Sequence, residues 1–137
     1  MIRLLPATIV LDSWAIMAYL EDEPAAEQVE MLILSARELG KQLTMSTINI
    51  GEVWYNTAQR ESEAEADRVV ANLRQLGIEF VVADWELTRQ AAAYKSSYPI
   101  AYADCFAAAL AKIKDAELIT GDPEFRQLEG EIRIHWI

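Results

Sequence analysis

The sequence predicts an α/β fold: a three-layer sandwich with a five-stranded, mainly parallel sheet and helices on both faces. Short apolar runs rich in β-branched residues alternate with longer segments of helical periodicity, as in successive βαβ units. The first run has no polar alternation and is expected to be a central strand, whereas the last alternates as an edge strand would. The expected strands are Thr8–Leu11, Gln42–Ser46, Glu79–Ala83, Glu117–Ile119 and Ile132–Ile137.

The helices between these strands are predicted from their end signals. Pro24 suits the first turn of the helix that precedes the second strand. Ser62 and Glu65 form a capping-box pattern, and Gly77 stands where that helix should stop. Asp84 is expected to cap the helix that follows the third strand.

The length and composition predict one domain over residues 1–137. A chain of this length is the size of an ordinary domain, and 53% hydrophobic with 25% charged residues is typical of a globular protein. The N-terminal apolar stretch is interrupted by Arg3 and Pro6, so it is too short for a membrane span or a signal peptide. A cytoplasmic location is therefore expected.

The single cysteine and single histidine limit the metal chemistry. Cys105 alone excludes an intramolecular disulfide and a thiolate zinc cluster, and His135 alone excludes a histidine-rich site. The net charge of −10 argues against a nucleic-acid surface, since an acidic protein repels phosphates. A cation held in an acidic pocket would reverse that repulsion locally.

Four carboxylates predict such a pocket. Asp12 and Asp122 follow apolar runs and should emerge at the carboxyl ends of strands, where open α/β sheets bind ligands. Glu52 and Asp104 stand in apolar, helix-patterned stretches, where a buried charge needs compensation. A site made only of carboxylates favours Mg²⁺ or Mn²⁺, and these ions promote hydrolysis of phosphodiesters.

Four motifs together resemble the PIN-domain ribonucleases, most closely the VapC toxins of toxin-antitoxin pairs. They are Asp12-Ser13, Asn49-Ile50-Gly51-Glu52-Val53, the stretch from Tyr102 to Ala111, and the stretch from Leu118 to Phe125. The resemblance implies a PIN-like sandwich and an Mg²⁺- or Mn²⁺-dependent endoribonuclease. It implies metal ligands at Asp12, Glu52, Asp104 and Asp122, with Glu52 binding the ion or orienting the attacking water. It also implies a homodimer, a VapB-like antitoxin, and structured RNAs as targets.

The chain departs from the VapC pattern near the first acid. Trp14 stands where VapC sequences often have a small or polar residue, and Ala101 stands near a usual serine. Trp14 therefore bears on the shape of the pocket mouth. Ser13 and Thr120 place hydroxyls beside the expected ligands, where each could hold a carboxylate or only cap a turn.

Other functions explain fewer of these residues. A dehalogenase-like phosphatase needs a second Asp where this chain has Trp14. A phosphorelay receiver needs a Lys near the last strand, and no Lys follows Ile119. Salt bridges from Arg60 or Lys112 could instead explain the buried acids. A catalytically degenerate PIN-like module that acts by binding protein or RNA also remains an alternative.

Two expectations concern partners. The apolar stretch Val53-Trp54-Tyr55 predicts an exposed patch that a second subunit covers. An acidic pocket also suits inhibition by an antitoxin whose basic C-terminal segment delivers an Arg or Lys to the four acids, in competition with Mg²⁺.

Overall fold

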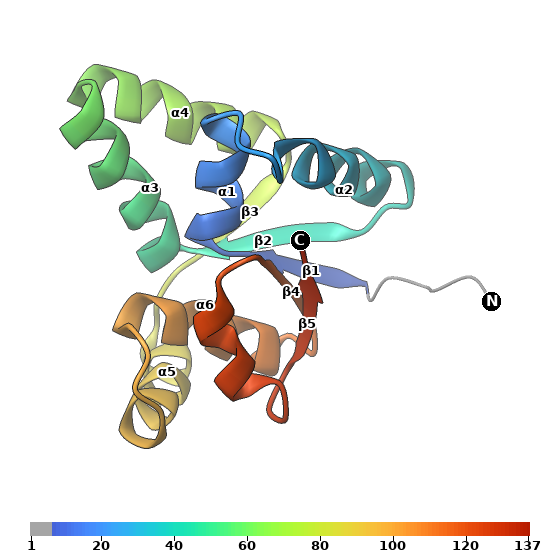
Figure 1. Cartoon of the computed structure of the whole chain (residues 1–137), viewed down its shortest axis with the longest axis vertical. Helices are drawn as coiled ribbons and strands as arrows, with labels where there is room; N and C mark the ends of the chain where they lie inside the picture. The colour runs from blue at the N-terminus through green and yellow to red at the C-terminus, as the bar shows by residue number, and fades with distance from the viewer. Residues whose placement is uncertain (1–6) are drawn as a thin grey trace.

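The computed structural model describes residues 7–137 and contains a five-stranded sheet in the order β3-β2-β1-β4-β5, with every neighbouring pair parallel (Figure 1). The predicted α/β fold is confirmed, with β1 in the centre and β5 at an edge. The apolar stretch with Arg3 and Pro6 lies outside the described residues. The strands are β1 (Thr8–Leu11), β2 (Gln42–Ser46), β3 (Ile78–Val81), β4 (Glu117–Thr120) and β5 (Arg133–Trp136).

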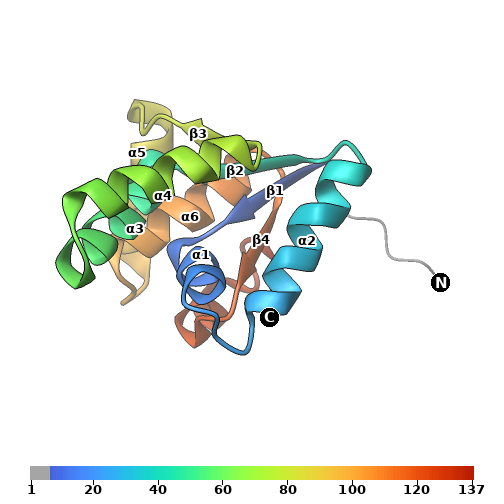
Figure 2. The same cartoon turned by 90° about the horizontal axis from the view of Figure 1, so that it is seen from above.

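Helices cover both faces of this sheet (Figures 1 and 2). They are α1 (Ser13–Leu20), α2 (Ala26–Glu38), α3 (Thr47–Arg60), α4 (Glu63–Gln75), α5 (Trp85–Ser97), α6 (Tyr102–Ile113) and the 3₁₀ helix η1 (Pro123–Leu128). None of the helices in the described part of the chain is both long and apolar enough to span a membrane.

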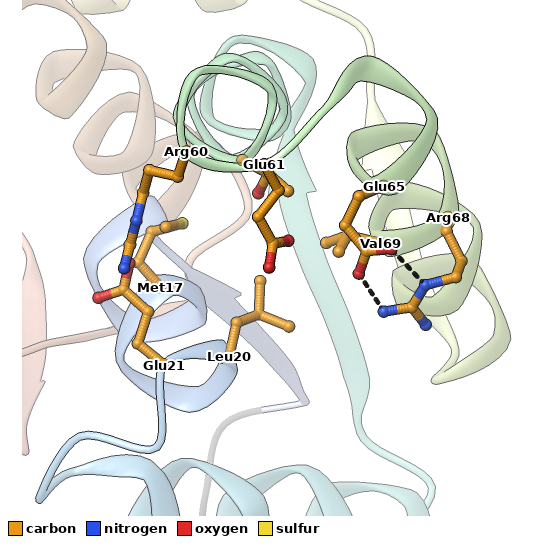
Figure 3. Close-up of a pocket in the computed structure, with 9 residues that line it drawn as sticks. Met17, Leu20, Glu21, Arg60, Glu61, Glu65, Arg68 and Val69 are labelled. Atoms are coloured by element: carbon orange, nitrogen blue, oxygen red, sulfur yellow. Dashed lines mark hydrogen bonds and ion pairs between the residues drawn. The ribbon is translucent and has the colours of Figure 1, made fainter.

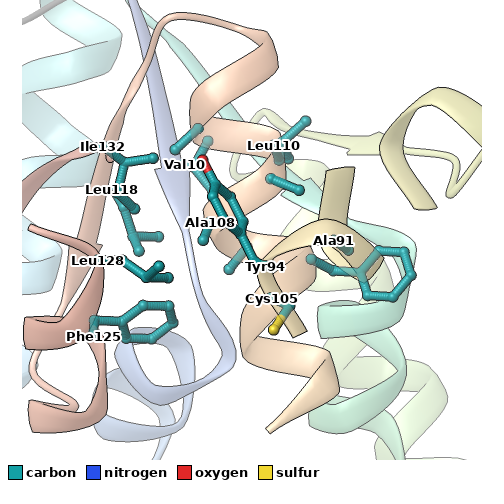
Figure 4. Packing of buried hydrophobic residues seen from close by; sticks show 14 of the residues in the cluster. Val10, Ala91, Tyr94, Cys105, Ala108, Leu110, Leu118, Phe125, Leu128 and Ile132 are labelled. Atoms are coloured by element: carbon teal, nitrogen blue, oxygen red, sulfur yellow. The ribbon is translucent and has the colours of Figure 1, made fainter. Parts of the chain in front are cut away.

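The side chains of β1 divide between two hydrophobic cores, because successive residues of a strand point to opposite faces. Ile9 and Leu11 pack with apolar residues of α1 to α4. Val10 lies in the other core, among residues of α5, α6 and η1 (Figure 4). A strand buried on both faces needs the unbroken apolar run that β1 has.

Most of the predicted helix ends are present. Asp84 caps α5 by accepting from Leu87 N at 2.9 Å, and Gly77 takes the left-handed conformation (φ 87°) that ends α4. Ser62 caps α4, but the Glu65 side chain pairs with Arg68 rather than closing a capping box. Pro24 was expected in the first turn of α2, and it instead precedes the N-cap residue, Ala25.

The apolar stretch of α3 is mostly packed within the chain. Val53 is fully buried, and the Trp54 indole N–H donates to Asp67 Oδ1 at 2.9 Å. Tyr55 is 48% exposed. The exposed patch expected from these three residues is therefore reduced to Tyr55, with Ile48 two helical turns before it on α3.

Candidate functional site

The candidate site lies at the carboxyl edge of two adjacent strands. Asp12 follows β1 and caps α1, while Asp122 follows β4 and caps η1 through Glu124 N at 3.0 Å. Since β1 pairs directly with β4, these two strand ends are neighbours. The sheet topology thus brings together two acids that are far apart in the sequence.

Asp12 is completely buried and anchored at both carboxyl oxygens. Oδ1 accepts from Ala15 N at 2.8 Å, and Oδ2 accepts from the Thr120 hydroxyl at 2.5 Å. Burial raises the pKa of Asp12 to about 7, and the charges of Asp122 and Glu52 add to the rise while the two hydrogen bonds oppose it. Thr120 also accepts from Asp122 N at 3.1 Å, so it links the two acids.

Glu52 reaches the site from α3 and is held by two side chains. Ser13 Oγ donates to Glu52 Oε1 at 2.7 Å, and Asn49 Nδ2 donates to the same oxygen at 3.2 Å. Asn49 Nδ2 also donates to the carbonyl oxygen of Ala103 at 3.0 Å, which ties α3 to the start of α6. Asn49 belongs to a motif noted in the sequence, but its role as a link to α6 was not predicted, because its contact with Ala103 spans 54 residues.

Asp104 projects from the first turn of α6 and is only 9% exposed. Burial raises its pKa to about 8, helped by the charges of Asp122, Glu52 and Asp12 and by a hydrogen bond with Glu124. Oxygen atoms of Asp104, Asp122 and Glu124 all lie within 4.8 Å of one another. This tight group contains a residue, Glu124, that was not among the expected ligands.

Glu124 could have been recognised from its position. It stands two residues after Asp122, beyond a proline at the start of η1. The tight 3₁₀ turn brings Glu124 back toward Asp104, so a second acid at this spacing extends the acidic cluster.

The donor set fits a hard divalent cation. Five carboxylates meet at the carboxyl edge, they supply only oxygen ligands, and two of them have pKa values raised by burial and by their neighbours. The salt-bridge alternative is not supported among residues 7–137, because Arg60 pairs with Glu21 and neither Arg60 nor Lys112 pairs with Glu52 or Asp104. The charges at the site thus lack an internal counter-ion in the described chain.

The indole of Trp14 covers the loop between β4 and Asp122. A Cβ atom built on Gly121 would lie 2.2 Å from Trp14 Cη2 and 2.4 Å from Trp14 Cζ3. Only a residue without a side chain permits so close an approach. Trp14 nevertheless remains 36% exposed, so the ring lies beside the acidic residues and is open to solvent.

A separate groove of about 400 Å³ lies between α1, α3 and α4 (Figure 3). Met17, Leu20 and Val69 give it apolar walls, and the ion pairs Arg60–Glu21 and Arg68–Glu65 flank it. The acids of the candidate site do not line this groove, so the two features are separate.

Comparison with known proteins identifies the family to which the fold belongs. Residues 9–131 match the family model of the PIN domain. A search of curated protein sequences gave no match.

Several solved structures share the architecture at low identity. VapBC2 of Rickettsia felis, solved bound to a promoter DNA fragment, has a TM-score of 0.71 and 14% identity over 95% of this chain and 98% of that one. Mycobacterium tuberculosis VapC20, described as a sarcin-ricin loop cleaving toxin, has a TM-score of 0.72 and 16% identity over 90% and 95% of the two chains. FitAcB of Neisseria gonorrhoeae has a TM-score of 0.67 and 22% identity over 92% and 95%.

The two kinds of comparison agree with the arrangement of strands and helices described above. The resemblance seen in the sequence is confirmed at the level of family and fold. Because the matched residues, 9–131, make up most of the 137 residues, the protein belongs to the PIN domain family.

Proposed function

We propose that the protein is a metal-dependent endoribonuclease that hydrolyses RNA phosphodiester bonds with Mg²⁺ or Mn²⁺. The supporting observation is the oxygen-only cluster at the carboxyl edge, in which Asp104, Asp122 and Glu124 lie within 4.8 Å and Asp12 and Glu52 lie alongside. The ligands expected from the sequence, Asp12, Glu52, Asp104 and Asp122, are retained in this proposal, and Glu124 is added. The shared fold with a toxin that cleaves the sarcin-ricin loop agrees with this reaction class.

The role proposed for each acidic side chain follows from the residues that surround it. Asp104, Asp122 and Glu124 would hold the ion, and Asp12 would complete its ligands, fixed in place by Thr120. A bound divalent cation would lower the pKa of the attacking water and neutralise charge on the phosphodiester. Ser13 and Asn49 hold the Glu52 carboxylate in place, and Glu52 would either bind the ion or orient the attacking water.

The decisive experiment compares Asp104→Asn with wild type in RNA cleavage and in calorimetric titration with MgCl₂ or MnCl₂. We expect the variant to lose cleavage and to bind the ion more weakly, while its fold is unchanged, because an amide lacks the charge that holds the ion. Glu86→Gln, the matching change in the first turn of α5, should leave both properties unchanged. Cleavage by Asp104→Asn at the wild-type rate would contradict the proposal.

The same experiment separates the nuclease from the alternative of a degenerate PIN-like binding module. A degenerate module would bind RNA or protein without cleaving RNA. It would also show no loss of metal binding when Asp12 or Asp104 is changed, because its function would not depend on an ion.

We further propose that the protein is the toxin of a VapBC-type pair, acts in the cytoplasm and forms a homodimer. The VapBC and FitAB structures that share its fold contain toxin-antitoxin complexes. The groove between α1, α3 and α4 is lined by Met17, which lies four residues or about 6 Å along α1 from Ser13. An antitoxin segment in this groove could therefore extend an Arg side chain to the acids.

The antitoxin proposal is tested with the small protein encoded by the neighbouring open reading frame. Leu20→Arg should weaken its binding, whereas Leu39→Arg, at a leucine that is more exposed and outside the groove, should not. Raising the Mg²⁺ concentration should weaken inhibition if an Arg competes for the carboxylates. Equal binding by both variants would place the antitoxin elsewhere.

A further inference from the structure

We propose that Trp14 is a substrate-positioning residue whose indole stacks on a nucleobase next to the scissile phosphate. The inference rests on the proposed ribonuclease function and names a contact that this chain makes with its substrate. It depends on three observations: where the ring lies, what supports it, and how acidic the rest of the protein is.

The ring is built into the edge of the site. Trp14 follows Asp12 by two residues and packs on Gly121, the residue before Asp122. An aromatic side chain is thereby fixed between the backbone segments that carry two of the proposed ligands. A phosphate held at the acids would place its neighbouring base within reach of this ring.

The Trp14 ring is supported by the backbone of Gly121. Cβ at position 121 would come within 2.8 Å of three indole atoms, so the glycine allows the ring to lie directly on the backbone. A platform held in this way loses little conformational entropy when a base stacks on it, since the side chain is already ordered. The 36% of Trp14 that is exposed offers the free surface that such stacking needs.

The net charge of the protein favours a contact of this kind. At −10 the chain gains little affinity from the RNA backbone, because phosphate binding depends on Lys and Arg. Base stacking on an aromatic ring does not require positive charge and tolerates any base. Trp14 would therefore supply part of the affinity that Lys and Arg side chains supply in basic RNA-binding proteins.

The first test is the steady-state cleavage of a single-stranded RNA oligonucleotide by Trp14→Leu and Trp14→Phe. Leucine is apolar but cannot stack, so we expect KM to rise about tenfold with kcat changed less than twofold. Phenylalanine should restore most of the wild-type KM. Trp85→Leu, at an indole that is 72% exposed and lies at the start of α5, is the matched control and should leave KM unchanged.

The second test does not need cleavage. In an Asp104→Asn protein with the other three tryptophans changed to phenylalanine, Trp14 is the only indole and reports contact by fluorescence. We expect the RNA oligonucleotide to quench it and an oligonucleotide of the same length with abasic residues to quench it much less. Circular dichroism checks the fold of each variant.

The outcomes separate the inference from the proposed function. If wild type cleaves RNA but Trp14→Leu keeps its KM and the abasic oligonucleotide quenches equally, Trp14 does not position the substrate. A Trp14→Leu change that affects only antitoxin binding also overturns the inference. If wild type does not cleave RNA, the proposed function fails, and base-dependent quenching still decides whether Trp14 contacts nucleobases.

Discussion

Ser13 Oγ donates a 2.7 Å hydrogen bond to Glu52 Oε1, and this bond joins the first residue of α1 to the middle of α3. Together with the hydrogen bond from Asn49 Nδ2 at 3.2 Å, it fixes the position of the Glu52 carboxylate. The hydroxyl that the sequence placed beside the first acid thus acts on a different acid, Glu52, across 39 residues of chain.

Ser13→Ala should lower kcat for RNA cleavage by about tenfold, because a hydrogen bond to a charged group contributes ~1.5–3 kcal/mol and a tenfold change corresponds to ~1.4 kcal/mol. Ser96→Ala removes an exposed hydroxyl that donates to the Ala93 carbonyl within α5, so it should leave kcat unchanged. Steady-state kinetics of both variants make the comparison. An equal effect in the two would show that Ser13 does not orient Glu52.

Asn49→Ala should both destabilise the protein and reduce activity. Asn49 is completely buried, and its loss leaves the Ser46 hydroxyl and the Ala103 carbonyl without this partner, at a cost of ~1–3 kcal/mol. Asn56→Ala is the control, since the Asn56 amide bonds within α3 to the Glu52 carbonyl at 2.8 Å. Urea unfolding should show the larger loss for Asn49→Ala, and similar losses would contradict the proposed link between α3 and α6.

Without metal, the stability of the protein should fall as the pH rises from 5 to 8. The pKa values of Asp12 and Asp104 are raised to about 7 and about 8, well above the ordinary value of an aspartate side chain. In this window the folded state therefore binds more protons than the unfolded state, and the free energy of unfolding decreases with pH. The stabilisation that comes from protonated Asp12 and Asp104 is complete below the pKa of these groups in the unfolded state. It is lost as the pH rises through their pKa values in the folded state.

Melting temperatures in a chelating buffer test this expectation. Wild type should melt several degrees lower at pH 8 than at pH 5, and Asp12→Asn should show a shallower fall because one of the two groups no longer titrates. Mg²⁺ should stabilise the protein more at pH 8 than at pH 6, since protons compete with the ion for the carboxylates. A melting temperature that is constant or rises over this range would contradict the raised pKa values.

Gly121→Ala should destabilise the protein by ~1–3 kcal/mol, because the new methyl group would overlap the Trp14 ring. Gly51→Ala is the matched control. Gly51 lies inside α3 with nothing within 4 Å of the added Cβ, so alanine there should stabilise the protein by ~0.5–1 kcal/mol. Adding Trp14→Ala to Gly121→Ala should recover part of the loss. Equal effects of the two glycine changes in thermal unfolding would contradict the packing of Trp14 on Gly121.

The sequence predicted which strand is central and which lies at an edge, because the signals for these positions lie within each strand. The unbroken apolar run of β1 and the alternation of β5 indicated a central and an edge strand, and both are confirmed. Strand ends were less certain: β3 begins at Ile78 and ends at Val81, whereas Glu79–Ala83 was expected. Pairing with β2 from Leu43 to Ser46, rather than local composition, sets these limits.

The candidate site was predictable only in part, since its contacts are long-range. Asp12 and Asp122 followed from strand ends, and Glu52 and Asp104 from acids within apolar helices. Asn49 and the packing of Trp14 were missed, because each depends on a contact between elements that the sequence does not place side by side. Glu124 was missed although its spacing from Asp122 is a local signal.

The pairing of β1 with β4 also has a consequence for synthesis on the ribosome. Asp12 emerges early, but its partner Thr120 is 108 residues later, and β4 must add to the sheet before the two meet. A nascent chain that lacks β4 and η1 has no place for Asp122 or Glu124 and therefore no assembled acidic cluster. Assembly of the acidic cluster therefore has to wait until β4 and η1 have left the ribosome and β4 has paired with β1.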